Sequence, residues 1–291
     1  MFYSVKKLLT NALGLDIAGP ALAVRPDDTF VVSYPRSGNT WTRFLIANLL
    51  HPQEPATFLN IGRFVPDAEV QSSHYMRRIP SPRVIKSHTY FDPRYPRVIY
   101  IVRDPRDVAP SEYDLLRKYR RIEDSYPLAR FIDDFVSGAG SLASAGWGTW
   151  GENVASWAFA RGARQGFLLL RYEDLKACPK QELARVAEFL KIDASPERLQ
   201  GVLDRSSADS MREMEKKQDW GSTKNKNKRS DIPFVRTASV GGWTRRLGAE
   251  SIVKIESAWG HIMAQLGYKT VTSALGNDHR TLLDVLGLPG C

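Results

Sequence analysis

The stretch that decides the fold is Phe30-Val31-Val32-Ser33-Tyr34-Pro35-Arg36-Ser37-Gly38-Asn39-Thr40-Trp41. It begins with a short apolar run that contains β-branched residues, which predicts a buried strand. Residues 34–40 are rich in turn formers, and apolar residues then recur at helical spacing as far as Leu49. The pattern therefore predicts a strand, a loop and a helix in direct succession.

Three later apolar runs predict further strands. They are Arg83-Val84-Ile85-Lys86-Ser87, Val98-Ile99-Tyr100-Ile101-Val102 and Phe167-Leu168-Leu169-Leu170. Helical patterns accompany them, among them residues 179–190 and a late amphipathic pattern over residues 252–266. Nearly continuous apolar strands separated by helices are typical of a parallel sheet that is buried on both faces. The sequence thus predicts a three-layer α/β fold with a central parallel sheet and a P-loop-like, phosphate-binding strand-loop-helix.

The composition is that of an ordinary globular protein. The 291 residues are enough for a sizeable core, and 43% are hydrophobic and 25% charged. Because no repeat and no domain boundary stands out, we expect a single domain over residues 1–291. The formal net charge of +9 suits an anionic partner such as nucleic acid, acidic lipid or a multiply charged nucleotide.

The cysteines and the first residues bear on localisation. Cys178 and Cys291 form no CxxC pair, which favours a reducing compartment, and no apolar run reaches the roughly 20 residues that span a bilayer. Residues 1–15 lack the cleavage site of a signal peptide and form either a helix packed on the domain or a basic amphipathic helix on a membrane surface. We therefore expect a cytoplasmic protein without a transmembrane segment.

The loop at residues 34–41 is a candidate anion site. A loop between a buried strand and a helix N-terminus presents backbone N–H groups without partners, and the helix dipole favours negative charge. Arg36 adds a positive charge, and Ser37 and Thr40 add hydroxyl donors. Gly38 lets the backbone approach a phosphate closely. The Walker A sequence G-x-x-x-x-G-K-[ST] is absent, which argues against an ATPase or a P-loop kinase.

This loop resembles the 5′-phosphosulfate loop of the sulfotransferases that use 3′-phosphoadenosine-5′-phosphosulfate (PAPS), the family that contains the cytosolic enzymes. Those enzymes usually have Tyr-Pro-Lys-Ser-Gly-Thr-Thr-Trp, whereas this chain has Arg36 for the lysine and Asn39 for a threonine. The resemblance implies that the donor is contacted by Arg36, Ser37, Gly38, Asn39, Thr40 and Trp41.

A second phosphate site is implied where the third predicted strand ends. Arg103-Asp104-Pro105-Arg106-Asp107-Val108 resembles the start of the family's 3′-phosphate motif, which assigns Arg103 and Ser111 to the 3′-phosphate. Guanidinium and hydroxyl groups both bind phosphate oxygens. From the residues alone, Arg103 could instead pair with Asp104 or Asp107 as part of a salt-bridged helix cap.

Residues 234–243 resemble the family's late signature Arg-Lys-Gly-x-x-Gly-x-Trp. Arg236, Gly241 and Trp243 are in register, while Thr237 and Ala238 replace the Lys-Gly pair. The resemblance implies that Arg236, Thr237 and Ala238 take part in donor binding, with one positive charge fewer than usual.

Two weaker resemblances concern the nucleoside. Tyr172, and Ser210 with Met211, lie where the family contacts this part of the donor. Tyr172 could equally be a tyrosine of the core. With them the resemblance runs from about Phe30 to Tyr268, and its elements follow the family's order.

Lys86-Ser87-His88 resembles the family's Lys-Thr-His, in which the histidine is the general base and the lysine stabilises charge. An acceptor hydroxyl must lose its proton as its oxygen attacks sulfur, and a histidine with a near-neutral pKa can take that proton. The departing bisphosphate gains negative charge, which Lys86 and Arg36 can stabilise. Arg36 remains protonated, so it stabilises charge without donating a proton. A histidine after a strand can also be a purely structural hydrogen-bonding group.

The acceptor is poorly defined by the sequence. The stretches 58–82 and 113–150 carry aromatic residues that either line an apolar pocket for a phenol, a steroid-like alcohol or a lipid, or belong to the core: Phe64, Tyr75, Tyr119, Trp147 and Trp150. Residues 215–233 are polar and Lys-rich, which predicts a mobile loop that is either a lid or a solvated segment.

The sequence therefore predicts an enzyme that transfers a sulfuryl group from PAPS to a hydroxyl or amine of a small-molecule, lipid or glycan acceptor, with His88 as base. A catalytically weak nucleotide-binding protein of the same fold is the alternative, because of the departures at Arg36, Thr237 and Ala238. A nucleic-acid-binding protein is disfavoured, since no zinc-ligand spacing, recognition-helix pattern or RNA-binding aromatic motif accompanies the positive charge. We expect no metal site.

Overall fold

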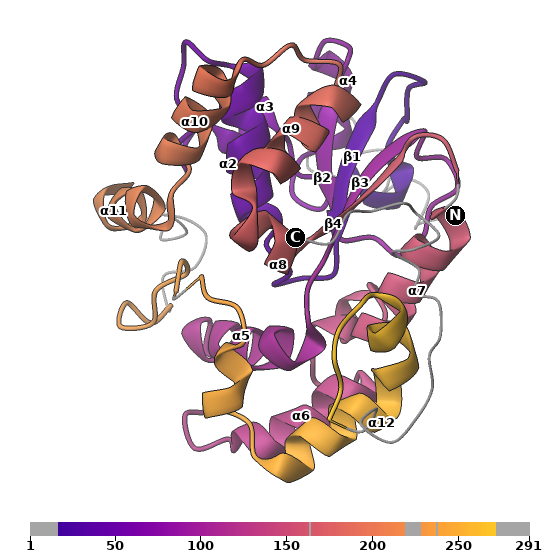
Figure 1. Ribbon diagram of the computed structural model, residues 1–291, viewed down its shortest axis with the longest axis vertical. Helices are drawn as coiled ribbons and strands as arrows, with labels where there is room; N and C mark the ends of the chain where they lie inside the picture. Colours follow the sequence, from indigo (N-terminus) through magenta and orange to yellow (C-terminus); the bar gives the residue numbers. More distant parts are fainter. Residues whose placement is uncertain (1–16, 163, 219–227, 237, 272–291) are drawn as a thin grey trace, which may run out of the picture.

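A parallel sheet of four strands lies at the centre of the protein (Figure 1). The computed structural model describes residues 17–162, 164–218, 228–236 and 238–271. The strands are β1 (Thr29–Ser33), β2 (Val84–Ser87), β3 (Arg97–Val102) and β4 (Phe167–Arg171), and they lie in the order β2-β1-β3-β4. In the register, Val31 pairs with Lys86 on one side and with Ile99 on the other. All four predicted strands are confirmed, with each end within one residue of its predicted position.

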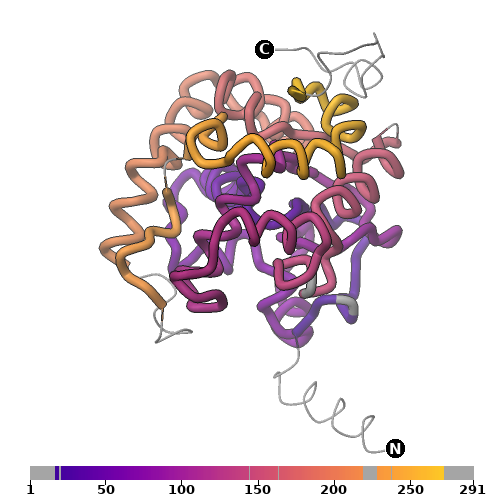
Figure 2. The backbone as a smooth tube through the Cα atoms, turned by 90° about the horizontal axis from the view of Figure 1, so that it is seen from below, coloured from indigo at the N-terminus to yellow at the C-terminus, as the bar shows by residue number. Residues whose placement is uncertain are grey.

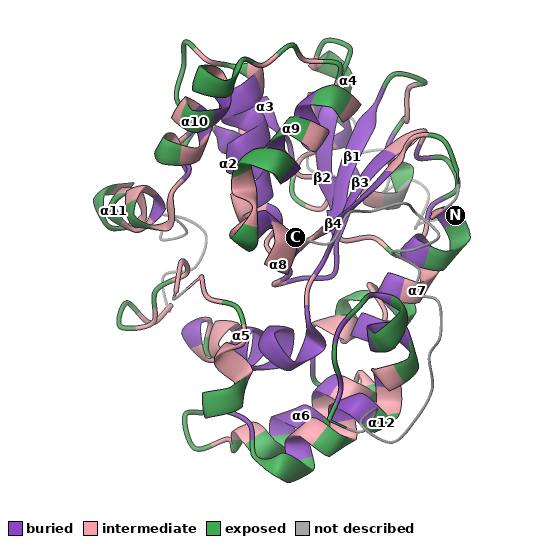
Figure 3. Cartoon of the chain, viewed as in Figure 1, coloured by how far each residue is buried: buried purple, intermediate pink, exposed green. Residues whose placement is uncertain are grey.

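Helices cover both faces of the sheet, as predicted for three layers (Figures 1 and 3). One face packs on α2 (Asn39–Leu50), α3 (Ile61–Phe64), α9 (Pro179–Phe189) and α10 (Pro196–Arg205). The other packs on α5 (Pro105–Lys118), α6 (Leu128–Ser137), α7 (Trp150–Arg161) and α12 (Ala249–Gln265). The alternation of side chains along β1 explains this arrangement, because Val31 joins the first core and Phe30 and Val32 join the second.

The remaining described elements are the helices α4 (Ser73–Arg78), α8 (Tyr172–Ala177) and α11 (Ala208–Gln218), and the 3₁₀ turns η1 (Gly19–Ala21), η2 (Leu142–Ala145) and η3 (Gly242–Arg245). The prediction of a mobile loop over residues 215–233 is wrong at its start, because residues 215–218 belong to α11. Residues 219–227 of that loop, and the candidate membrane-surface helix at residues 1–15, lie outside the described residues.

Two findings concern the predicted localisation. Within the described ranges, no helix is long and apolar enough to cross a membrane. Cys178 takes part in a disulfide. Cysteine usage therefore no longer favours a reducing compartment, and the cytoplasmic location stays a prediction.

A buried ionic cluster fixes the start of α5 against α12. Arg106 contacts Asp104 and Glu256 at 2.7 Å each, and its guanidinium lies 4.2 Å from the centre of the Trp243 ring. Asp104 also caps α5 by accepting a hydrogen bond from the Arg106 N–H at 2.9 Å. Figure 2 shows α12 lying along α6 at this side of the molecule. These contacts set the position at which β3 leads into α5, where Arg103 lies.

Candidate active site

A cavity of about 830 Å³ opens where the four strands end. Segments that follow β1, β2, β3 and β4 line it, which is the usual place for a ligand in an open parallel sheet. Most of the predicted site residues line this cavity: Arg36, Gly38, Asn39, Thr40, Trp41, Lys86, His88, Arg103, Ser111, Tyr172, Met211, Arg236 and Ala238. Ser37 and Ser210 do not line it, and Thr237 lies outside the described residues.

The loop between β1 and α2 depends on Gly38. This glycine has φ 100°, and a Cβ atom placed on it would lie 2.5 Å from Cδ2 of Tyr172. A larger residue would therefore be strained and would also clash with the ring. Next to it, the hydroxyl of Ser37 is buried and finds no hydrogen-bond partner among the described residues. A loop whose glycine lets a ligand approach the backbone, next to a buried hydroxyl without a partner, suits an anionic ligand.

Asn39 anchors the same loop to the strand before it. Its side-chain amide donates to the Val31 carbonyl and to the Ser33 hydroxyl, at 3.2 Å each. The donor contact that the resemblance implies for Asn39 therefore cannot involve this amide nitrogen while it holds β1. The substitution of threonine by asparagine ties the start of α2 to the sheet.

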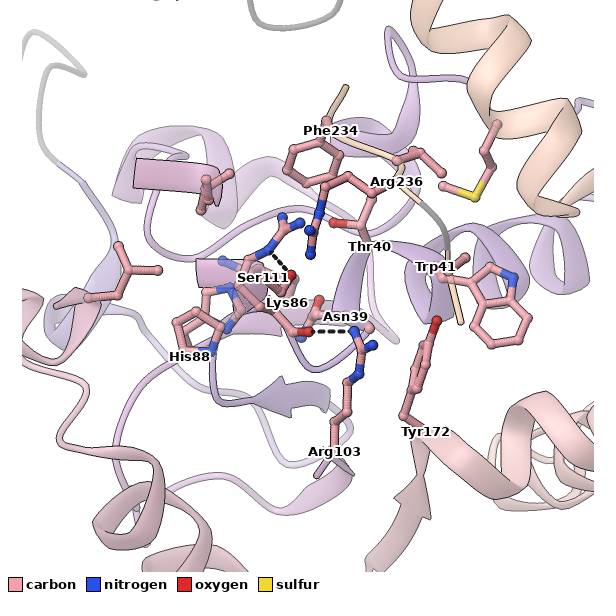
Figure 4. Close-up of a pocket in the computed structure, with 18 of the residues that line it drawn as sticks. Asn39, Thr40, Trp41, Lys86, His88, Arg103, Ser111, Tyr172, Phe234 and Arg236 are labelled. Carbon is pink, nitrogen blue, oxygen red and sulfur yellow. Dashed lines mark hydrogen bonds between the residues drawn. The ribbon is translucent and has the colours of Figure 1, made fainter. Parts of the chain in front are cut away.

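Three arginines from distant segments converge on the cavity (Figure 4). The Nε of Arg36 donates to the Ser111 hydroxyl at 2.9 Å, and Arg103 donates to the Arg36 carbonyl at 3.4 Å. Arg236 pairs with Asp114 on α5. Burial, followed by the charges of Arg236 and Arg103, lowers the pKa of Arg36 to about 10. Three positive charges with two nearby carboxylates, Asp107 and Asp114, leave a net positive charge that favours an anionic ligand.

Arg103 contributes only weakly to a salt-bridged helix cap, which is its alternative role. Asp104 is held by Arg106, and Asp107 lies 3.7 Å from the Arg103 guanidinium. Arg103 instead donates to the Ser239 carbonyl at 2.9 Å, and its buried Nε finds no partner among the described residues. The guanidinium thus keeps hydrogen-bonding capacity inside the cavity.

Aromatic side chains form another part of the cavity wall. The rings of Trp41 and Tyr172 meet edge to face with their centres 5.8 Å apart, and the Arg103 guanidinium lies 4.3 Å from the centre of the Tyr172 ring. Figure 4 shows these two rings across the cavity from His88. Lys176, which the sequence did not single out, lies over Trp41 at 5.1 Å and also lines the cavity. Flat apolar faces with flanking cations suit a nucleobase.

The prediction for Ser210 is shifted by one helical turn. Its hydroxyl contacts the Ser207 hydroxyl at 2.8 Å and the Asp204 carbonyl at 3.2 Å. Ser207 and Ala208 line the cavity at this place, together with the predicted Met211. The residues at the start of α11 are therefore the ones available to a ligand.

His88 follows β2 and faces the cavity (Figure 4). Its Nδ1 lies 2.7 Å from the Ser33 carbonyl oxygen. A carbonyl oxygen can only accept a hydrogen bond, so Nδ1 carries the proton and Nε2 of the neutral ring keeps a lone pair. Burial, followed by the charge of Lys86, lowers the pKa of His88 to about 3. The imidazole is therefore neutral near pH 7 and able to accept a proton.

Lys86 lines the cavity but is already paired. Its ammonium lies 2.6 Å from Glu69 and 3.1 Å from Asp67. The sequence did not single out either carboxylate, because they belong to no motif. The charge that Lys86 was expected to offer to a leaving group is thus largely balanced within the protein.

Several apolar side chains line the cavity: Val70, Leu115, Leu142, Trp147 and Phe234. Of these, Trp147 lies beside His88, with the two ring centres 5.3 Å apart. Of the aromatic residues proposed for an acceptor pocket, Tyr119 and Trp147 line the cavity. The others belong to or pack on the two cores, namely Phe64, Tyr75 and Trp150. Across the described part of the chain, no group of His, Cys, Asp or Glu side chains suits a metal ion.

Ala238 has a strained backbone at the edge of the cavity. Its φ is 50°, in the left-handed region that favours glycine. The related signature has glycine here, the residue that adopts a positive φ at least cost, whereas this chain adopts a positive φ with alanine. The adjacent lysine of that signature is Thr237 here, and the arginines that line the cavity are Arg36, Arg103, Arg121 and Arg236.

Known proteins share sequence and fold with this chain. The family model described as "Sulfotransferase domain" matches residues 26–267. Sulfotransferase 1E1 of Bos taurus is 27% identical over 234 residues, which cover 75% of this chain and 77% of that protein. The 3-beta-hydroxysteroid sulfotransferase of Cavia porcellus is 27% identical over 231 residues, covering 76% and 78%. Among solved structures, retinol dehydratase in complex with androsterone and inactive cofactor PAP superposes with a TM-score of 0.68 at 20% identity, covering 85% of this chain and 83% of that one.

Proposed function

The chain belongs to the sulfotransferase family, and from this premise we propose that it transfers a sulfuryl group from PAPS to a hydroxyl group of a small apolar acceptor, with His88 as the general base. The observation that carries the proposal is the neutral His88 ring, with Nε2 available, in the same cavity as three arginines. We keep the single-domain organisation and the cytoplasmic location as predictions.

The cavity suits the donor in chemistry. Two arginines that line the cavity, Arg103 and Arg236, have buried Nε atoms without partners among the described residues, and phosphate oxygens would satisfy such groups. We propose that Arg103, Ser111 and Arg236 hold the 3′-phosphate and that the loop at residues 36–40 holds the 5′-phosphosulfate. Trp41 and Tyr172 would then contact the base. Bound PAPS supplies the sulfuryl group and the bisphosphate that leaves.

His88 and Arg36 divide the chemical work in this proposal. Nε2 of His88 takes the proton of the acceptor hydroxyl, and the Ser33 carbonyl that holds Nδ1–H stabilises the imidazolium that results. Arg36 remains charged at neutral pH although burial lowers its pKa to about 10. Its charge stabilises the negative charge that develops on the leaving group. Trp147 beside His88, and Leu115 and Leu142 in the lining of the same cavity, favour a phenol or an apolar alcohol over a charged acceptor.

Calorimetric titration with 3′,5′-adenosine bisphosphate (PAP), beside ADP, tests the donor site. We expect binding that requires the 3′-phosphate and that weakens roughly 10- to 100-fold in Arg103→Ala, since hydrogen bonds to charged groups contribute about 1.5–3 kcal/mol each. Arg117→Ala is the matched control, because Arg117 lies on α5, the helix that follows Arg103, pairs with Asp124 and does not line this cavity. If PAP binds no better than ADP, the donor assignment is wrong.

Turnover of labelled PAPS tests the base. We expect His88→Ala to lose on the order of 100-fold or more in kcat with an apolar phenol or alcohol, the usual contribution of a general base. PAP binding to the same variant should stay near that of the wild type. An undiminished kcat in His88→Ala would remove the base from the mechanism and leave the family assignment intact.

A further inference from the structure

One partly buried carboxylate contacts three consecutive residues around the base. Glu69 accepts hydrogen bonds from the Lys86 ammonium at 2.6 Å, from the Ser87 hydroxyl at 2.9 Å and from the backbone N–H of His88 at 2.5 Å. Both carboxylate oxygens are used, Oε2 for Lys86 and Oε1 for the other two. A single side chain thus holds the whole turn that follows β2.

The backbone around Glu69 is itself fixed to β2. The Lys86 N–H donates to the Pro66 carbonyl at 2.8 Å, and the Ala68 N–H donates to the Lys86 carbonyl at 3.0 Å. These two bonds pair the segment 66–69 with the outer edge of β2, the strand at one end of the sheet. Glu69 therefore reaches the turn from a rigid base rather than from a loose loop.

The two carboxylates of this cluster, those of Asp67 and Glu69, bind the Lys86 ammonium. Asp67 adds a second carboxylate 3.1 Å from the ammonium. Burial alone would raise the pKa of Glu69, but Lys86 and the hydrogen bonds from its neighbours hold it below its ordinary value. Glu69 is thus an anion at neutral pH, and the Lys86 charge serves first to keep this anion in place.

We propose that Glu69 is a positioning residue for the base: it holds the turn Lys86-Ser87-His88 so that Nδ1 of His88 donates to the Ser33 carbonyl and Nε2 stays directed to the acceptor. The inference rests on the proposed role of His88 as the general base. Glu69 touches neither donor nor acceptor, since it does not line the cavity, and it acts through the His88 ring alone. Lys86 supports this positioning because it is the counterion of Glu69.

Two substitutions separate the effect of the Glu69 charge from the effect of its hydrogen bonds to Ser87 and His88. Glu69→Ala removes all three contacts, and a misplacement of the base of about 1 Å can cost on the order of 100-fold in kcat. Glu69→Gln keeps one oxygen, which can still accept from the Ser87 hydroxyl and the His88 N–H while Asp67 retains Lys86. We expect this variant to stay within about 10-fold of the wild type, the effect of one weakened hydrogen bond to a charged group. Glu54→Ala, which removes an exposed carboxylate paired with Arg63, is the control.

The readouts distinguish positioning from stability. We expect KM for PAPS and the affinity for PAP to change less than twofold in both Glu69 variants, because the phosphate-binding residues are untouched. In the protein without ligand, ¹⁵N NMR of the His88 ring should show the Nδ1–H tautomer in the wild type and in Glu69→Gln, and a mixture of tautomers in Glu69→Ala.

Results opposite to these expectations would contradict either the positioning role of Glu69 or the proposed role of His88 as the base. A Glu69→Ala variant that binds PAP and keeps both the wild-type kcat and the Nδ1–H tautomer contradicts the positioning role. If His88→Ala also keeps its activity, the proposed base is wrong and the inference fails with it. If Glu69→Ala fails to fold, Glu69→Gln decides: loss of PAP affinity together with kcat would mean that Glu69 supports the fold and not the base.

Discussion

His88 combines a fixed tautomer with a strongly lowered pKa. The Ser33 carbonyl holds the proton on Nδ1, and burial lowers the pKa of the ring to about 3. A general base must be deprotonated to act, so activity is lost only as the pH falls through this low value. An ordinary histidine, with a pKa near 6.5, would already be mostly protonated at pH 5.

The first prediction concerns pH dependence. We expect kcat/KM for PAPS, which reports on the enzyme before the donor binds, to stay within twofold between pH 7 and pH 5. An ordinary histidine would lower it about 30-fold over the same range. Circular dichroism at each pH shows that the protein stays folded. An acidic limb near pH 6.5 would mean that the ring is solvated in the working enzyme.

Individual residues that line the cavity could be predicted where they belong to a sequence motif. Arg36, His88 and Arg103 come from separate stretches, and the structure brings them to one cavity. Their roles stay predictions until the titrations above are made. Glu69 was missed because its contacts form only when two segments pair at the edge of the sheet. Nothing in the local pattern of residues 66–69 indicates that pairing.

At the scale of elements, the strand-loop-helix around Gly38 was predictable because its signals are local. A β-branched run, a cluster of turn formers and a helical period suffice to define it. The end of α11 shows the opposite case. Residues 215–218 are polar, yet Met211 is buried and Glu215 accepts hydrogen bonds from the N–H groups of Phe234 and Val235 at 2.6 and 2.9 Å. These tertiary contacts extend the helix where composition predicts a loop.

Gly38→Ala tests how tightly α8 closes on the phosphate loop. The new methyl group would meet the Tyr172 ring at 2.5 Å on a backbone with φ 100°. We expect a loss of about 1–3 kcal/mol in the free energy of unfolding, together with weaker PAP binding. Urea unfolding and calorimetry measure the two effects.

Gly260→Ala serves as the control for that change. Gly260 lies in α12, and an added Cβ would meet nothing within 4 Å. Alanine in a helix is favoured over glycine by roughly 0.5–1 kcal/mol, so this variant should be more stable than the wild type. Unchanged stability and PAP affinity in Gly38→Ala would show that the Tyr172 ring yields without cost.

At the scale of the whole molecule, buried carboxylates set the dependence of stability on pH. Glu112 accepts from the Tyr34 hydroxyl at 3.0 Å and from the Leu142 N–H at 2.6 Å, and burial raises its pKa to about 7. Burial likewise raises the pKa of Glu173 to about 7. Between the unfolded value of 4.5 and this raised value, the folded protein binds more protons than the unfolded chain. These groups therefore make the protein less stable as the pH rises from about 4.5 to 7.

Glu112→Gln removes one of these titrations and keeps a side chain of the same shape. We expect the variant to gain stability relative to the wild type as the pH rises through this range, by up to about 3 kcal/mol. Urea unfolding at pH 5, 6 and 7 measures the difference. Glu213→Gln, at an exposed position on α11, should give a difference that does not vary with pH. A flat difference for Glu112→Gln would mean that water reaches this carboxylate.

The cavity as a whole was not predictable from the sequence. Lys176, Ser207 and Leu142 line it, although none carries a recognisable signal, because they approach only when α8, α11 and η2 pack around the sheet. The order of motifs indicated the type of ligand, whereas the shape of the acceptor side depends on side chains from several elements.

The pairing of residues 66–69 with β2 also bears on solubility. An unpaired edge strand is a template on which another molecule can add its own strand and start aggregation. Here the N–H and carbonyl of Lys86 on that edge are already bonded to Pro66 and Ala68 of the same chain. The segment that carries Glu69 therefore also covers part of the β2 edge and limits the addition of a strand from another molecule there.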